Sequence, residues 1–141
     1  MGIFFSNPRV EWMVTVSGVF DANRVAVVGA TERDGSVGRA ITRNLFEDFV
    51  GEVIPVNPNI DRVFDRPCRD SLSETDVDLV VIVVPPEIAL ETVETAGNEG
   101  IENIVVITAG FGETGSDGAK REAELRELAE EYGLNLVGPN C

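Results

Sequence analysis

Four short apolar runs and a fifth that Asn135 interrupts are spaced along the chain, and polar or turn-forming residues bound each of them. Continuous apolar runs of this length are typical of strands buried inside a sheet. The strongest strand signal is at residues 78–84, which end at Pro85 and Pro86, because proline stops a strand. The predicted strands cover residues 25–28, 53–56, 78–84, 104–107 and 134–137.

Between the runs, apolar residues recur at spacings of three and four, the pattern of a helix with one buried face. Residues 37–50 have this spacing, and Ser36 stands in the N-cap position before them. Two further helices are expected at about residues 87–99 and 117–132. The polar stretch 61–76 predicts an irregular connection with one short edge strand near Cys68.

Strands and helices alternate, so the predicted fold class is α/β, a doubly wound parallel sheet with helices on both faces. Sheets of this kind bind ligands in the crevice beyond the carboxyl ends of their strands. Four loops are expected at that edge, at residues 29–38, 57–59, 85–87 and 108–115.

The first of these loops has the features of a phosphate site. It leads from a strand into a helix, where backbone N–H groups and the positive end of the helix dipole favour an anion. Gly29 permits a sharp turn, Gly35 lets backbone approach a ligand, and Gly38 permits close helix packing. Thr31 and Ser36 add hydroxyl groups and Arg33 adds a positive charge. A turn without a ligand is the alternative, since such turns are often rich in glycine.

The glycine spacing differs from that of the dinucleotide fingerprint, which has a second glycine two residues after the first. A dinucleotide domain also carries an acidic residue at the end of its second strand, whereas this chain has Asn57, Pro58 and Asn59 there. Both features argue against NAD. The glycines of residues 108–115 leave backbone free to bind a polar chain such as pantetheine, or the segment is a surface loop without a ligand.

The charge composition limits the classes of partner that we expect. The 141 residues have the length of one domain, with 25 acidic and 11 basic residues and a net charge of −14. So negative a surface repels nucleic acid and anionic membranes, and neither is expected as a partner. A halophilic source and an ordinary acidic protein both fit this composition.

Several kinds of chemistry are excluded. There is no histidine, so histidine acid–base catalysis, histidine metal ligation and a phosphohistidine on this sequence are ruled out. Cys68 and Cys141 lack the spacing of a zinc site or a disulfide framework. Residues 1–20 lack the pattern of a signal peptide, and we expect a cytoplasmic protein.

Taken in order, the loops resemble a known family. The motifs that carry the resemblance are Val25 to Thr31, Gly35-Ser36-Val37-Gly38, Pro55-Val56-Asn57-Pro58, Val83-Val84-Pro85-Pro86, Ile107 to Phe111 and Gly138-Pro139-Asn140-Cys141. Together they look like the CoA-binding domain of the NDP-forming acyl-CoA synthetases, relatives of the succinyl-CoA synthetase α subunit. The likeness covers about residues 19–141 and implies a Rossmann-like CoA-binding domain preceded by an extension, residues 1–18.

The resemblance implies where coenzyme A would lie. The nucleotide phosphates would lie at the first loop and the adenosine portion at the tip formed by Asn57, Pro58 and Asn59. The coenzyme would then run along the third and fourth loops towards its thiol. The implied binding residues are Gly29, Thr31, Arg33, Gly35, Ser36, Val37, Gly38, Asn57, Pro58, Asn59, Val84, Pro85, Pro86, Ile107, Thr108, Ala109 and Asn140.

The sequence departs from the family at one charged position. The family commonly has lysine where this chain has Asn59, so a cation for a phosphate is missing. Arg33, Arg39 and Arg62 are the candidates to replace it.

The implied function is binding of CoA or acyl-CoA as the N-terminal domain of an ADP-forming acyl-CoA (acetyl-CoA) synthetase. The other synthetase domains or subunits would be its partners and would carry the phosphoryl-transfer steps. A non-enzymatic CoA-binding module is the first alternative. An NAD(P)-binding oxidoreductase domain is the second, and the loop spacing and the tip at Asn57 disfavour it.

Overall fold

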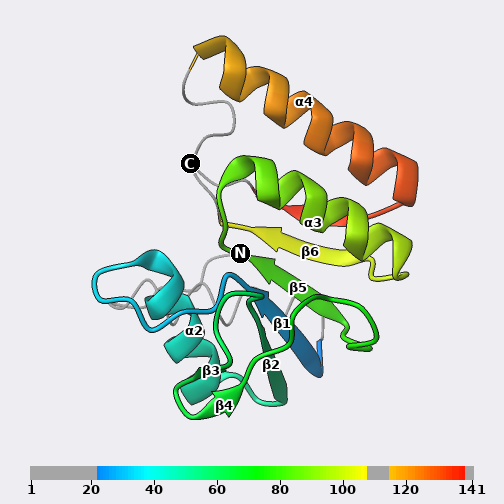
Figure 1. Ribbon diagram of the computed structural model, residues 1–141. Coiled ribbons are helices and arrows are strands. Elements are labelled where there is room, and N and C mark those ends of the chain that lie inside the picture. The colour runs from blue at the N-terminus through cyan, green and yellow to red at the C-terminus, as the bar shows by residue number, and fades with distance from the viewer. Residues whose placement is uncertain (1–21, 108–114, 139–141) are drawn as a thin grey trace, which may run out of the picture.

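The computed structural model describes residues 22–107 and 115–138. Within them, five parallel strands form one sheet in the order β2-β1-β5-β6-β7 (Figure 1). The alternation of strands and helices therefore gives the predicted α/β parallel sheet. The predicted extension, residues 1–18, lies outside the described residues. The elements of the sheet and its helices are β1 (Arg24–Val28), α2 (Val37–Asp48), β2 (Glu52–Val56), β5 (Leu79–Ile82), α3 (Pro86–Asn98), β6 (Asn103–Val106), α4 (Gly115–Tyr132) and β7 (Asn135–Val137).

The order of the strands creates a crevice beside β1. This strand pairs with β2 on one side and with β5 on the other, both in parallel. The chain leaves β1 through α2 to reach β2, and it later returns past β1 to begin β5. The connections after β1 and β5 run in opposite directions from neighbouring strands, and a parallel sheet binds ligands at such a point.

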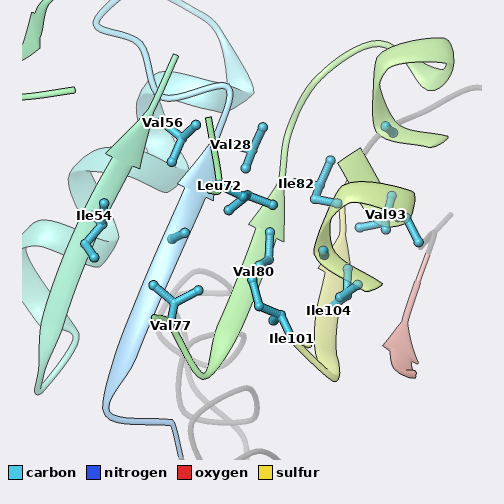
Figure 2. Packing of buried hydrophobic residues seen from close by; sticks show 14 of the residues in the cluster. Val28, Ile54, Val56, Leu72, Val77, Val80, Ile82, Val93, Ile101 and Ile104 are labelled. Carbon is cyan, nitrogen blue, oxygen red and sulfur yellow. The ribbon is translucent and has the colours of Figure 1, made fainter. Parts of the chain in front are cut away.

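Alternate residues of β1 pack on opposite faces of the sheet. Val25 and Val27 lie in a buried cluster with Leu45 of α2. Ala26 and Val28 lie in a second cluster with residues of α3 and α4, part of which Figure 2 shows. Full burial of a valine or leucine side chain contributes about 1.5–3 kcal/mol to stability. The predicted arrangement, with helices on both faces, is confirmed because α2 covers one face and α3 and α4 cover the other.

Helices α3 and α4 pack side by side (Figure 1). A glycine makes the contact close, since a Cβ on Gly97 of α3 would lie 2.4 Å from Cγ of Tyr132 in α4. The Tyr132 hydroxyl donates a hydrogen bond to Asn98 Oδ1 at 3.0 Å. No helix among the described residues has the length and hydropathy needed to span a membrane.

The polar connection between β2 and β5 differs from expectation. A single edge strand is predicted near Cys68, whereas the structure has an antiparallel hairpin of β3 (Arg62–Val63) and β4 (Arg66–Pro67). Its turn places Phe64 and Asp65 at positive φ, 47° and 65°. Beyond the hairpin, the main chain at Arg69 bonds to the outer edge of β2.

The β3–β4 hairpin is attached to α2 and to the loop after β1. Phe64 meets the ring of Phe46 edge-on, with ring centroids 6.2 Å apart. The guanidinium of Arg66 lies 3.8 Å from the centroid of the Phe46 ring. The Glu32 carboxylate accepts a hydrogen bond from the Phe64 N–H at 2.7 Å. The hairpin and the glycine loop are therefore directly connected.

Candidate ligand-binding cleft

A cleft of about 920 Å³ opens at the carboxyl ends of β1, β2 and β5. Its position is the one that the strand order predicts, and its volume lies within the range of about 300–1,000 Å³ of small-molecule sites. The loop after β1 and the start of α2 form one wall. The first turns of α3 and the segment 70–72 form another.

Two glycines shape the wall after β1. Gly29 has φ of 97°, and its N–H donates to Val56 O at 3.0 Å. A Cβ at Gly29 would lie only 2.3 Å from the backbone oxygen of Val83, so the β1 and β5 ends approach too closely for any side chain. At Gly38, a Cβ would lie 2.9 Å from Cγ2 of Thr31. The glycine loop and α2 are therefore packed closely together.

The start of α2 presents unpaired backbone donors. Ser36 is the N-cap: its Oγ accepts a hydrogen bond from Arg39 N at 3.0 Å and donates one to Arg33 O at 2.7 Å. The N–H groups of Val37 and Gly38 have no acceptor among the residues that the structure describes. The Ser36 hydroxyl thus stabilises the helix, and the two backbone N–H groups remain for an anion.

Apolar side chains face the cleft from both walls. Val37 is 57% exposed and Ile88 is 47% exposed, and both line it. Val84, Pro85 and Pro86 add further apolar surface after β5. A concave site with apolar walls and a few directed polar groups is typical of small-ligand binding.

Asn57 connects the loops at the tip of β2. Its Nδ2 donates to Ala30 O at 2.9 Å, and its Oδ1 accepts from Asn59 N at 2.8 Å. Its backbone N–H donates to Arg69 O at 2.9 Å. One residue therefore holds three segments together. Residues 57–59 of the tip carry no carboxylate, unlike the end of the second strand in a dinucleotide domain; the Asp70 carboxylate that lines the cleft comes from the later connection to β5.

The structure brings together most of the residues that the sequence singles out. The predicted residues that line the cleft are Gly29, Thr31, Arg33, Ser36, Val37, Gly38, Asn57, Pro58, Asn59, Val84, Pro85, Pro86 and Ile107. Gly35 is not among the lining residues; its φ is 77°, and a Cβ there would meet nothing within 4 Å, so its role in ligand binding stays a prediction. Thr108, Ala109 and Asn140 lie outside the described residues.

Two groups of residues that line the cleft were not predicted from the sequence. One is Asp70, Ser71 and Leu72, whose path depends on the packing of Leu72 against the sheet (Figure 2). The other lies on α3 at Ile88, Glu91, Thr92 and Thr95. Their spacing of three, four and seven residues places these four on one helix face, and that regularity was a readable signal.

The structure separates the three arginines that were candidates to replace a missing cation. Arg33 lines the cleft. Arg39 donates to Glu32 O at 2.8 Å and its guanidinium lies 5.3 Å from the centroid of the Phe64 ring. Arg62 donates to the backbone oxygen of Asp65. Neither Arg39 nor Arg62 lines the cleft.

A cleft at this point of a parallel sheet, with free helix amides on one side and apolar surface on the other, defines a Rossmann-like domain of the class that binds nucleotides and coenzymes. Comparison with known proteins identifies the particular family. Residues 23–141 match the family described as "CoA binding domain". The chain belongs to this family.

The relatives are mostly longer proteins. The chain is 47% identical over 119 residues to the ADP-forming acetate–CoA ligase I of Archaeoglobus fulgidus, an alignment that covers 83% of this chain and 17% of the ligase. Among solved structures, the dinucleotide forming acetyl-coenzyme A synthetase 1 of Ca. Korarchaeum cryptofilum superposes with a TM-score of 0.79 at 36% identity. That superposition covers 89% of this chain and 28% of the synthetase.

One similar structure is short. A conserved hypothetical protein from Pyrococcus furiosus superposes with a TM-score of 0.67 at 30% identity, covering 84% of this chain and 95% of that protein. Domains of this kind therefore occur within long chains and nearly alone. The chain matches the CoA-binding portion of ADP-forming acyl-CoA synthetases and spans about a fifth of the first of these relatives.

Proposed function

We propose that the cleft binds coenzyme A. The observation that carries this proposal is the start of α2, where the N–H groups of Val37 and Gly38 lack acceptors among the described residues and Arg33 stands beside them. The diphosphate of the coenzyme would bind there, because backbone donors and the helix dipole favour an anion. An apolar wall lies across the cleft from this point.

The remaining parts of the coenzyme would follow the other loops. The adenosine portion would lie at the tip formed by Asn57, Pro58 and Asn59, and the pantetheine chain would run along residues 84–86 towards Ile107. Thr108, Ala109 and Asn140 stay predicted contacts near the far end of the coenzyme.

In this proposal the chain supplies the CoA-binding part of an ADP-forming acyl-CoA synthetase, and its partners are the other synthetase domains or subunits. The names of the long relatives support this assignment. The sequence contains no histidine, so a phosphohistidine step would have to occur on another part of the enzyme. The chain would then bind and present CoA or acyl-CoA.

A stand-alone CoA-binding module is the second candidate. The short Pyrococcus furiosus structure, 95% of which is covered, favours it. The coding sequence after Cys141 discriminates between the two. A continuation into further synthetase domains supports the synthetase, and a stop codon at that point supports the module.

Calorimetric titration with CoA, acetyl-CoA and NAD, at low and at molar salt, tests the proposed ligand. CoA should bind and NAD should not. Arg33→Ala should weaken CoA binding about tenfold or more, because a charge-assisted contact contributes about 1.5–3 kcal/mol.

Arg126→Ala is the matched control. It removes the same charge from α4, where the described structure gives Arg126 only an exposed pair with Glu122 at 3.1 Å. CoA affinity should change little in this variant. NAD binding without CoA binding would refute the proposal, and an equal loss in both variants would remove Arg33 from the site.

A further inference from the structure

The charged side chains of the cleft are unevenly matched to an anionic ligand. Among the described residues, Arg33 is the one cation that lines the cleft, whereas Asp70 and Glu91 line it with carboxylates. Neither carboxylate has an ion-pair partner within residues 22–107 and 115–138. Arg62 and Arg69 lie near Asp70 in the sequence, but neither lines the cleft.

The two carboxylates lie away from the start of α2. The Arg69 N–H donates to Pro55 O and its oxygen accepts from Asn57 N, each at 2.9 Å, so Asp70 leaves the edge of β2 directly beside the tip. Glu91 lies on α3, where it lines this cleft and also a second hollow shared with α4. Positive charge therefore lies where a diphosphate fits, the Asp70 carboxylate lies beside the proposed adenosine end, and the Glu91 carboxylate adds negative charge to the α3 wall.

Coenzyme A carries a diphosphate in its middle and a further phosphate on the 3′-oxygen of its ribose. A carboxylate next to that phosphate repels it. We propose that this cleft binds the coenzyme without gaining affinity from its 3′-phosphate, and that Asp70 and Glu91 disfavour that phosphate. The inference rests on the proposed function and extends it: 3′-dephospho-CoA should bind at least as tightly as CoA.

The ratio of the two dissociation constants tests this inference. The 141-residue chain is titrated with CoA and with 3′-dephospho-CoA at about 0.1 M salt, where charges interact over about 10 Å, and at about 1 M, where they interact over about 3 Å. At the lower salt, 3′-dephospho-CoA should bind about two- to fivefold more tightly than CoA, as expected for charges several ångströms apart in a water-like dielectric. The ratio should approach one at the higher salt.

Asp70→Asn and Glu91→Gln separate the local effect from the overall charge of −14. Each should strengthen CoA binding more than 3′-dephospho-CoA binding and so lower the ratio. Glu102→Gln is the matched control. It removes one negative charge just before the amino end of β6, and the cleft lies at the opposite, carboxyl ends of the strands. This control should leave the ratio as it is.

The outcomes are distinct. Tighter binding of CoA than of 3′-dephospho-CoA at the lower salt would overturn the inference and leave the proposed function intact. An equal change in Glu102→Gln and Asp70→Asn would overturn the role of the cleft carboxylates. Failure of both ligands to bind at either salt would overturn the proposed function, and the inference with it.

Discussion

Replacing Gly29 with alanine should destabilise the fold and disable the cleft together. The residue has φ of 97°, which costs a side-chain-bearing residue about 1–2 kcal/mol. Its new Cβ would also lie 2.3 Å from the backbone oxygen of Val83 and 2.9 Å from Cγ1 of Val84. Both contacts require the end of β5 to move, and overpacking of this kind costs about 1–3 kcal/mol more. We therefore expect a loss of about 2–5 kcal/mol in the free energy of unfolding.

Gly35→Ala is the matched control. Its φ of 77° carries a similar backbone cost, but a Cβ there would meet nothing within 4 Å. This variant should lose only about 1–2 kcal/mol. It should also keep its affinity for CoA, because Gly35 does not line the cleft.

Denaturant unfolding at constant salt, followed by circular dichroism, measures both free energies, and calorimetry at temperatures where each variant is folded measures binding. The close approach of the β1 and β5 ends predicts that Gly29→Ala is the more destabilised variant by about 1–3 kcal/mol. Equal losses in the two variants would refute the steric part of this reasoning. Weakened CoA binding in Gly35→Ala alone would refute the assignment of these glycines.

Three further predictions concern residues outside the cleft. The Asp78 carboxylate accepts two backbone N–H bonds at the start of β1, each at 3.0 Å, so Asp78→Ala should cost about 1–3 kcal/mol of unfolding free energy and Asp78→Asn less. Gly97→Ala should cost about 1–3 kcal/mol by pushing Tyr132 from its place on α3, and Tyr132→Ala should abolish that penalty when the two changes are combined. Burial, and then the negative charge of Asp61, raises the pKa of the Cys68 thiol. The alkylation rate of Cys68, measured against pH in a Cys141→Ser variant, should therefore be half-maximal at a pH above the ordinary thiol pKa. Asp61→Asn should lower that midpoint pH, and a midpoint at or below the ordinary thiol pKa would contradict this account.

The strands and helices follow from local pattern because burial on one or two faces is written into the spacing of apolar residues. The exact ends of the elements depend on backbone conformation, which the pattern does not show. The helix predicted for residues 37–50 ends at Asp48 because Phe49 is already extended, with φ of −75° and ψ of 129°. The β3–β4 hairpin was missed because its turn uses Phe64 and Asp65 at positive φ, where a glycine would have been the usual signal.

The wall of the cleft after β1 was predictable for a similar reason. Its loop combines glycines with a helix start, a local signal that needs no knowledge of distant contacts. The opposite wall was not predictable in the same way. Asp70 reaches the cleft because the chain at Arg69 bonds to the edge of β2 and because Leu72 packs on the sheet, and both are contacts between distant segments.

Asn57 has a consequence for how quickly and at what entropic cost a ligand binds. Its side chain and main chain tie the glycine loop, the tip of β2 and the chain at Arg69 together through hydrogen bonds within the protein. A cleft held in this way is preorganised, so association does not have to order its loops first. We expect association rates limited by encounter and electrostatic repulsion, and a smaller entropic penalty than in an Asn57→Ala variant, whose loops would have to be ordered by the ligand itself.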